Sequence, residues 1–356
     1  MKRTYAVVFS MALVFSMALI WVSCGSGEAS GGNPDVGGQE EWRGEDGAPS
    51  EGVGPVDWSA EEGVGAEETT GESGGGDVGA DMGPAVPLGA LECLLAPECG
   101  RVLVAAHRGD HADHPENSLA SIRGAAALGA DFVEVDSRLT ADGAVVLMHD
   151  GTVDRTTDGE GNVSDLTLEQ IRALRLKGAD ADDPESLRVP TLAEALLLAK
   201  ELGLMVYLDQ KAENWEAVVG VVRETKSESV ALIRDGLGTV LAMAPTCPDL
   251  LLMPAVADVA ELETALAAIP DLIIVELSYA EARPDFVAAA HALGIKVQQD
   301  VMATGDTFAT MGTTKGWLTF LEAGVDLWQS DLPHVLIPTL EEYYDSGEFP
   351  SEPVKP

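Results

Sequence analysis

The sequence predicts an α/β protein, a closed (β/α)8 barrel of the TIM type, preceded by a long polar segment. From about residue 100 onward, short apolar runs alternate with amphipathic stretches, and eight such units follow one another over about 240 residues. Strict alternation implies parallel strands joined by helical crossovers. The number of units and the length match a closed eight-stranded barrel. An open doubly wound sheet is the alternative, but no glycine-rich phosphate loop follows the first apolar run.

The apolar runs are 4 to 7 residues long, which is typical of buried strands. They cover 103–108, 132–138, 205–211, 230–233, 251–256, 272–277, 295–301 and 326–330, with 144–149 as an extension of the second strand. Helices are predicted at 118–128, 191–202, 215–224, 237–244, 259–269, 284–293, 307–322 and 335–344, with Asn117 as the cap of the first. Residues 151–189 break the alternation and predict an insertion with a short helix at 168–174.

The chain is strongly acidic, with a formal net charge of -39. This charge argues against a nucleic-acid partner, which requires a basic surface. Residues 25–92 hold 16 acidic side chains against one basic residue, Arg43, and few large apolar ones. Such a segment cannot bury enough surface to offset its ordering entropy, so it is predicted to be a disordered, extended tether.

The first 24 residues have the composition of a secretory signal. Lys2 and Arg3 precede an apolar run at 6–22, and Cys24 follows. The segment 1–24 resembles a bacterial lipoprotein signal, in which Cys24 becomes the lipidated first residue of the mature chain. That resemblance implies an exported protein, lipid-anchored to a membrane of the bacterial cell envelope. A transmembrane anchor and an ordinary cleaved signal are the alternatives.

Three further cysteines bear on the domain boundaries. Cys93 and Cys99 lie just before the first predicted strand, and export permits disulfides, so a Cys93–Cys99 bridge is predicted. Cys247 is then expected to be a buried thiol, although its exchange into the bridge stays open. We therefore place the barrel at 93–345 and a flexible tail at 346–356.

Polar side chains gather where the apolar runs end, and barrel enzymes carry their active groups at the C-terminal ends of strands. Three carboxylates at such positions form an oxygen-rich set suited to one divalent cation, Mg²⁺ or Ca²⁺. Two histidines can serve as general base and general acid, and two cationic side chains can bind a phosphate. The metal ligands are Glu134, Asp136 and Asp209, the acid–base pair is His107 and His149, and the phosphate-binding residues are Arg108 and Lys211.

Five of these residues, all but Asp209 and Lys211, belong to motifs that resemble the glycerophosphodiester phosphodiesterase family. The motifs are His107-Arg108-Gly109, Pro115-Glu116-Asn117-Ser118, Glu134-Val135-Asp136, Asp142-Gly143, His149-Asp150, Asp154-Arg155-Thr156-Thr157-Asp158-Gly159, Gly324-Val325-Asp326 and Ser330-Asp331-Leu332-Pro333. The resemblance implies the same metal, acid–base and phosphate-binding roles. It also implies hydrolysis of a small phosphodiester to glycerol 3-phosphate and an alcohol.

Two positions depart from the family pattern. Asp209-Gln210-Lys211 stands where the family usually has Glu-x-Lys, and the shorter side chain resembles the sphingomyelinase D branch. Lys296-Val297-Gln298-Gln299-Asp300 replaces a Trp-Thr stretch that helps to line the pocket. A lysophospholipase D or sphingomyelinase D-like phosphodiesterase is therefore one alternative. A non-catalytic surface binding barrel is the other. The oligomeric state cannot be inferred.

Overall fold

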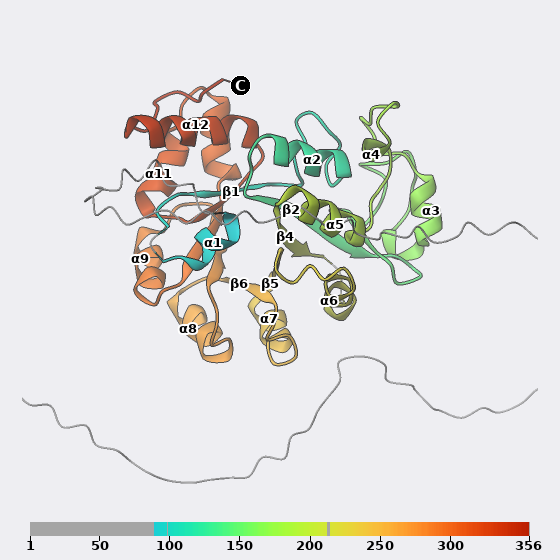
Figure 1. Ribbon diagram of the computed structural model, residues 1–356, viewed down its shortest axis with the longest axis horizontal. Helices are drawn as coiled ribbons and strands as arrows, with labels where there is room; N and C mark the ends of the chain where they lie inside the picture. Colours follow the sequence, from blue (N-terminus) through green and yellow to red (C-terminus); the bar gives the residue numbers. More distant parts are fainter. Residues whose placement is uncertain (1–88, 98, 212–213, 356) are drawn as a thin grey trace, which may run out of the picture. The chain divides into compact units, whose positions relative to one another are not determined.

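The computed structural model describes residues 89–97, 99–211 and 214–355 (Figure 1). The predicted signal at 1–24, the lipidation site Cys24 and most of the tether at 25–92 lie outside these residues. The first described element, helix α1 (Ala90–Leu95), crosses the boundary predicted at residue 92. In the part of the chain that the structure describes, no helix is long and apolar enough to cross a membrane.

A closed barrel of eight parallel strands forms the centre of the domain, as predicted. Each strand pairs in parallel with its neighbours, and pairing between the first two closes the ring. In ring order, the strands are β1 (Leu103–Ala106), β2 (Phe132–Leu139), β4 (Met205–Gln210), β5 (Ala231–Gly236), β6 (Leu251–Val256), β7 (Ile274–Leu277), β8 (Lys296–Asp300) and β9 (Leu327–Ser330).

Helices surround the barrel and follow the strands in the predicted alternation (Figure 1). Thr191 caps α5 by accepting a hydrogen bond from Glu194, and Gly203 ends that helix in a left-handed conformation, as the sequence indicates. The surrounding helices are α2 (Leu119–Ala127), α5 (Leu192–Leu202), α6 (Trp215–Glu224), α7 (Leu237–Met243), α8 (Val259–Ala268), α9 (Pro284–Ala292), α11 (Lys315–Ala323) and α12 (Pro333–Ser346).

Two helix predictions are wrong in detail. The cap of α2 is Ser118, whose side chain accepts a hydrogen bond from the Ser121 backbone, and Asn117 instead has a φ of 55°. The helix predicted at 307–322 is interrupted. A π-helical turn (Met302–Asp306) leads into α10 (Thr307–Thr310), and Gly312, with a φ of 82°, separates α10 from α11.

The run at 144–149 is predicted to extend the second strand, and this prediction is wrong. It folds back as β3 (Val145–Leu147), antiparallel to the end of β2. Gly143, with a φ of 81°, lies in the turn between the two strands, a conformation that glycine adopts without steric cost. The hairpin carries β2 past the barrel wall and brings the residues after β3 back toward the barrel.

The insertion at 151–189 has a small apolar core of its own. It contains the 3₁₀ turn η1 (Val163–Asp165), α3 (Leu168–Ala173) and α4 (Pro184–Leu187). Seven buried residues form this core, two of them on or next to β3: Val146, Met148, Val153, Val163, Ile171, Leu176 and Val189. The insertion therefore packs on the β2–β3 hairpin.

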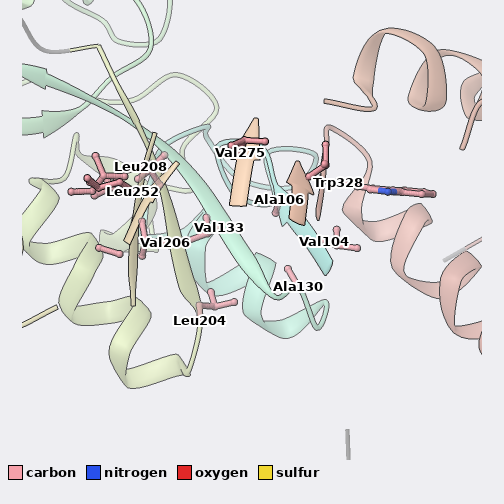
Figure 2. Close-up of a cluster of buried hydrophobic side chains, with 14 of the residues drawn as sticks. Val104, Ala106, Ala130, Val133, Leu204, Val206, Leu208, Leu252, Val275 and Trp328 are labelled. Carbon is pink, nitrogen blue, oxygen red and sulfur yellow. The ribbon is translucent and has the colours of Figure 1, made fainter. Parts of the chain in front are cut away.

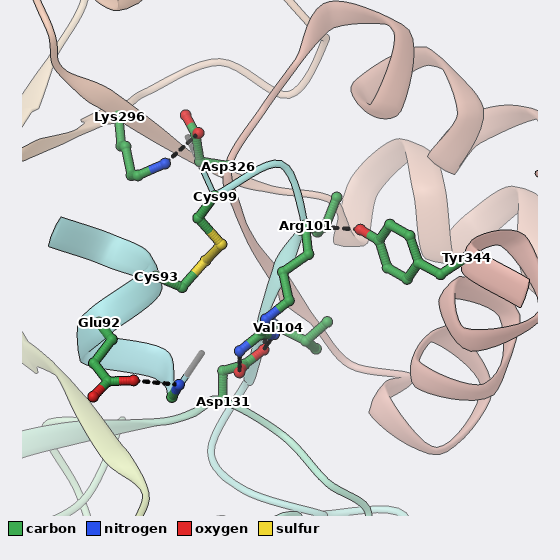
Figure 3. The surroundings of a disulfide bond; sticks show 11 residues. Glu92, Cys93, Cys99, Arg101, Val104, Asp131, Lys296, Asp326 and Tyr344 are labelled. Atoms are coloured by element: carbon green, nitrogen blue, oxygen red, sulfur yellow. Dashed lines mark hydrogen bonds and ion pairs between the residues drawn. A yellow bond between two sulfur atoms is a disulfide. The ribbon is translucent and has the colours of Figure 1, made fainter. Parts of the chain in front are cut away.

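Most of the apolar core lies between the barrel wall and the helices, and Trp328 is fully buried in it (Figure 2). A second cluster fills the barrel floor. There Cys93 and Leu94 of α1 pack with interior residues such as Phe132 and Met205. Cys93 forms the predicted disulfide with Cys99, which ties α1 to the chain entering β1 (Figure 3). Cys247 is buried and lies outside this bridge.

The segment predicted as a flexible tail at 346–356 is packed on the domain in its described part. The ring of Phe349 lies 5.6 Å from that of Tyr343, and the Val354 backbone donates a hydrogen bond to Thr339 (3.1 Å). The Thr314 hydroxyl donates to the Pro350 carbonyl. The Phe349 ring, the Pro350 carbonyl and the Val354 backbone supply these contacts, which the polar composition of the tail conceals.

Candidate active site

The alternation of side chains along the barrel strands brings the polar residues to one end of its interior. In β2, Phe132 packs in the barrel floor, and Glu134 and Asp136 follow it on the same face. In β4, Tyr207 and Asp209 occupy the same face in turn. The register places Asp136 beside Asp209. Glu134 and Asp136 lie within β2 rather than at its end, because β2 continues into the hairpin.

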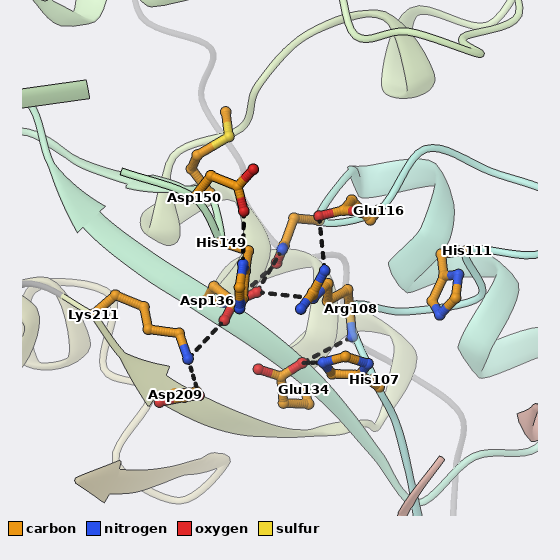
Figure 4. A network of polar contacts seen from close by, with 12 residues as sticks. His107, Arg108, His111, Glu116, Glu134, Asp136, His149, Asp150, Asp209 and Lys211 are labelled. Atoms are coloured by element: carbon orange, nitrogen blue, oxygen red, sulfur yellow. Dashed lines mark hydrogen bonds and ion pairs between the residues drawn. The ribbon is translucent and has the colours of Figure 1, made fainter. Parts of the chain in front are cut away.

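The three predicted metal ligands converge. One carboxylate oxygen from each of Glu134, Asp136 and Asp209 lies within 4.8 Å of the other two (Figure 4). Glu134 and Asp136 are each 1% exposed. Burial raises the pKa of Glu134 well above its ordinary value, and the negative charges of Asp136 and Asp209 raise it further.

This donor set fits a hard divalent cation. Asp136 Oδ1 is buried and accepts no hydrogen bond from the described residues, so it has a lone pair for a ligand bond. Buried carboxylates that repel one another are stabilised when a cation binds between them. The chemistry of three carboxylate oxygens favours Mg²⁺ or Ca²⁺ over softer metals.

Asp209 is held by two cationic side chains. Lys211 Nζ donates to Asp209 Oδ2 (2.5 Å) and lies 3.4 Å from Asp136 Oδ1. Arg234 Nη1 donates to Asp209 Oδ1 from the neighbouring strand (3.2 Å). Lys211 is thus beside the metal ligands, as predicted, whereas sequence reasoning missed Arg234. A lone arginine in an apolar run gave no motif signal.

Arg108 contacts the same carboxylates through both its backbone and its side chain. Its φ is 54°, and its backbone N–H donates to Glu134 (2.8 Å). Its Nε lies 3.4 Å from Asp136, and its Nη1 donates to Glu116 (3.1 Å). The guanidinium therefore borders the oxygen cluster, where the sequence predicted a phosphate-binding group.

The carboxylate of Asp331 orients His107. Asp331 is part of a sequence motif, but no role was predicted for it. Its Nδ1 lies 2.6 Å from Asp331 Oδ1, and its Nε2 lies 3.9 Å from Glu134. His111 Nε2 also contacts Asp331 (2.9 Å). Burial raises the pKa of Asp331, but hydrogen bonds from the two histidines lower it well below its ordinary value. Because an ionised carboxylate only accepts hydrogen bonds, Nδ1 of His107 is the donor to Asp331, which leaves Nε2 as the acceptor nitrogen of a neutral imidazole.

His149 has a carboxylate partner of its own. Its Nδ1 lies 2.8 Å from Asp150, which Arg155 also binds (2.6 Å). Arg155 makes two hydrogen bonds to Glu116 (both 2.7 Å), and Glu116 accepts from Arg108. This chain of ion pairs joins the loop after β1 to the loop after β3, so it fixes the two histidine-bearing loops relative to each other. Figure 4 shows its two ends, His149 with Asp150 and Arg108 with Glu116.

Asn117 contacts the proposed metal ligand Asp136 and does not cap α2, the role predicted for it. Its side-chain amide donates to Asp136 Oδ2 (2.8 Å) and accepts from the Asp136 backbone N–H (3.0 Å). The side chain is 3% exposed. Asn117 thus orients the Asp136 carboxylate, and its left-handed backbone conformation, which asparagine tolerates, points the amide inward.

A family model described as the glycerophosphoryl diester phosphodiesterase family matches residues 107–326. This chain belongs to that family. The match begins at His107 and contains the carboxylate cluster, His149 and Lys211, whereas Asp331 lies just beyond its end.

Two curated relatives are similar over part of their length. Glycerophosphodiester phosphodiesterase 1 of Bos taurus is 48% identical over 123 residues, which are 33% of this chain and 36% of the relative. The glycerophosphodiester phosphodiesterase of Caldanaerobacter subterraneus subsp. tengcongensis is 44% identical over 112 residues, 32% of this chain and 46% of the relative. The chain thus spans less than half the length of either protein.

Solved structures support the fold over a longer stretch. A phosphodiesterase from Oleispira antarctica, in complex with the product sn-glycerol-3-phosphate, has a TM-score of 0.55 and 25% identity, covering 67% of this chain and 96% of that one. A glycerophosphoryl diester phosphodiesterase from Parabacteroides distasonis has a TM-score of 0.59 and 23% identity, covering 74% of this chain and 94% of that one. The second likeness bears on the fold alone.

Proposed function

We propose that this protein hydrolyses glycerophosphodiesters to glycerol 3-phosphate and an alcohol, with a divalent cation, Mg²⁺ or Ca²⁺, at Glu134, Asp136 and Asp209. The observation that carries the proposal is the buried three-carboxylate cluster, bordered by Arg108 and Lys211, beside a histidine that a carboxylate orients. The Oleispira antarctica structure, which holds sn-glycerol-3-phosphate, supports the product.

The residues around the cluster have distinct tasks in such a reaction. A cation bound there would offset negative charge on the phosphoryl oxygens. Arg108 and Lys211 supply fixed positive charge to the phosphate. His107 accepts or donates a proton at Nε2, and Asp331 holds its ring. His149, with Asp150 at its Nδ1, serves as the second acid–base group.

Turnover by the purified full chain tests the proposal. We expect release of glycerol 3-phosphate from glycerophosphocholine or glycerophosphoglycerol with Mg²⁺ or Ca²⁺, and none with a chelator. His107→Ala and His149→Ala should each lower kcat by about 10² to 10⁴. His334→Ala, on α12, is a matched control.

No turnover by a folded protein with either metal would refute the proposal. Equal ligand binding by the wild type and His149→Ala, with no product from either, would favour a binding barrel.

A lysophospholipase D or sphingomyelinase D-like activity is the second candidate, because Asp209 stands where the family usually has Glu and so resembles the sphingomyelinase D branch. The same assay includes a lysophospholipid and sphingomyelin. Turnover of either, with none of the glycerophosphodiesters, would select this candidate instead.

The N-terminal sequence supports a proposal about the cellular location. We propose lipidation at Cys24 and anchoring to a membrane of the cell envelope. Incorporation of a fatty-acid analogue into the wild type and its loss in Cys24→Ser is the expected result. Label retained by Cys24→Ser would refute it.

A further inference from the structure

A cavity of about 370 Å³ opens at the ends of β5, β7 and β8. Its polar lining includes Arg234, Glu276, Tyr279 and Asp300. It adjoins the metal-ligand cluster, because Arg234 donates to both Asp209 and Glu276. The volume is within the range of about 300 to 1,000 Å³ that small-molecule sites occupy.

The charges that line this cavity do not balance. Glu276 is fully engaged: it accepts from Arg234 through Nη2 (2.7 Å) and Nε, and from Tyr207 (3.0 Å). Asp300 accepts a hydrogen bond from Gln298 (3.0 Å), and no described Lys, Arg or His nitrogen forms an ion pair with it. One positive and two negative side chains thus leave a net charge of about -1 at neutral pH, by ordinary pKa values.

The electrostatics of Asp300 show the same imbalance. Burial raises its pKa to about 6, and the charge of Glu276 adds to the shift. The hydrogen bond from Gln298 and the positive charges of His107 and Arg234 oppose it without cancelling it. A carboxylate in this environment is stabilised when a cation enters the cavity.

An aromatic side chain stands at the rim of the cavity. Tyr279 is 45% exposed, and the guanidinium of Arg283 lies 5.0 Å from its ring centre. Gln299 donates to the Tyr279 carbonyl (3.1 Å) and so holds this loop against β8. The Tyr279 ring thus already contacts one cationic group, which Asp285 neutralises (3.1 Å). An aromatic ring that remains partly exposed, beside a carboxylate without an ion pair, is the combination that recognises organic ammonium groups.

We propose that this cavity binds the cationic head group of the substrate, so that the enzyme prefers glycerophosphodiesters of amino alcohols such as choline or ethanolamine to those with neutral alcohols. Asp300 supplies the counter-charge and Tyr279 an apolar, electron-rich wall. The inference rests on the proposed function. It also gives a role to the 296–300 segment, where the sequence departs from the family pattern.

Substrate selectivity tests the inference. The full chain, with Mg²⁺ or Ca²⁺, is assayed on glycerophosphocholine and on glycerophosphoglycerol, which has a neutral alcohol. Asp300→Asn should lower kcat/KM for glycerophosphocholine about tenfold and leave that for glycerophosphoglycerol within about twofold. Glu281→Gln, which removes an exposed carboxylate outside the cavity lining, should change neither value.

A second pair of variants guards against a folding defect at Asp300. Tyr279→Leu should lower kcat/KM for glycerophosphocholine about fivefold, and Tyr279→Phe should retain it, because phenylalanine keeps the aromatic face. Equal loss on both substrates in Asp300→Asn, or a wild type with no preference for glycerophosphocholine, would overturn the inference.

Binding of choline separates this inference from the proposed function. If the wild type hydrolyses no glycerophosphodiester, the proposed function fails, and calorimetry with choline decides the inference. Millimolar binding that Asp300→Asn weakens about tenfold would support it, whereas absence of binding would overturn it.

Discussion

At the scale of residues, the site is organised by side chains outside the set of three carboxylates formed by Glu134, Asp136 and Asp209. Asp331 and Asp150 each contact the Nδ1 of one histidine, and Asn117 holds the Asp136 carboxylate by a pair of hydrogen bonds. Histidines, metal ligands and Lys211 could be predicted from motifs at strand ends. The role of Asp331 could not, because it lies more than 200 positions from its partner His107 along the chain.

Replacing Asp331 by asparagine tests this organisation. Asp331→Asn removes the charge that orients His107, so kcat should fall about 10- to 100-fold, with a small change in KM. The hydrogen bond to Asp331 also raises the pKa of His111. In Asp331→Asn, the His111 titration, followed by NMR, should therefore move to lower pH.

The control for this substitution is Glu342→Gln, which alters an exposed carboxylate of α12. It should leave both kcat and the His111 titration unchanged. An unaltered His111 titration in Asp331→Asn would contradict the Asp331–His111 hydrogen bond, and an unaltered kcat would contradict the orientation of His107 by Asp331.

At the scale of elements, the segment between β1 and α2 carries His107 and Arg108, the proposed catalytic and phosphate-binding residues. Gly109 has a φ of 82° in this loop, and a Cβ added there would lie 2.7 Å from the Ser121 backbone carbon. Gly143, in the β2–β3 turn, has a φ of 81° with open space around it. The two glycines share a conformation and differ in their surroundings.

Alanine at the two positions should therefore have unequal effects. Gly143→Ala should cost about 1 kcal/mol of unfolding free energy from conformational strain alone. Gly109→Ala adds the overlap with Ser121, about 1 to 3 kcal/mol more, and displaces the loop, so activity should fall as well. Denaturant unfolding and turnover measure both effects, and equal costs would contradict the assigned packing.

The disulfide acts at the same scale, because it ties α1 to the segment that enters β1. Reduction should lower the unfolding free energy by about 2 kcal/mol, as expected for a short closed loop. Cys93→Ser/Cys99→Ser should remove this sensitivity to reductant, while Cys247→Ala should retain it. Thermal unfolding of both variants with and without reductant measures this sensitivity. Loss of the sensitivity in Cys247→Ala would refute the Cys93–Cys99 pairing.

At the scale of the whole molecule, a cation bound by the three carboxylates would couple metal binding to the stability of the fold. Metal at 100 times its Kd should raise the unfolding free energy by about 2.7 kcal/mol. Burial raises the pKa of Glu134, so a proton competes with the cation for this carboxylate more strongly than it would at an exposed glutamate. The stabilisation by Ca²⁺ or Mg²⁺ should therefore grow as the pH rises.

Thermal unfolding with and without metal checks this expectation. Glu134→Gln should abolish the metal-dependent shift, while Glu261→Gln, on the surface helix α8, should leave it intact. A shift that is independent of pH, or one that survives in Glu134→Gln, would contradict the assigned ligands.

The sequence by itself determined the barrel, the strands and the identity of the residues at its polar end. The reason is local: alternating apolar runs and helical stretches, with side chains at every second position of a strand on one face, need no long-range information. The β2–β3 hairpin and the break between α10 and α11 were not predicted. Both depend on the backbone conformation of a turn, which the pattern of apolar residues does not reveal.

Only the tertiary structure decided which distant side chains pair. Arg234 with Asp209, Asp331 with His107, and the unpaired Asp300 beside the engaged Glu276 depend on strands that are adjacent in the ring but distant in sequence. Ion pairs act over a few ångströms in space, whatever the separation along the chain. The chemistry of the cluster could therefore be predicted from the sequence, whereas its charge balance, and with it the proposed preference for a cationic head group, required the closed barrel.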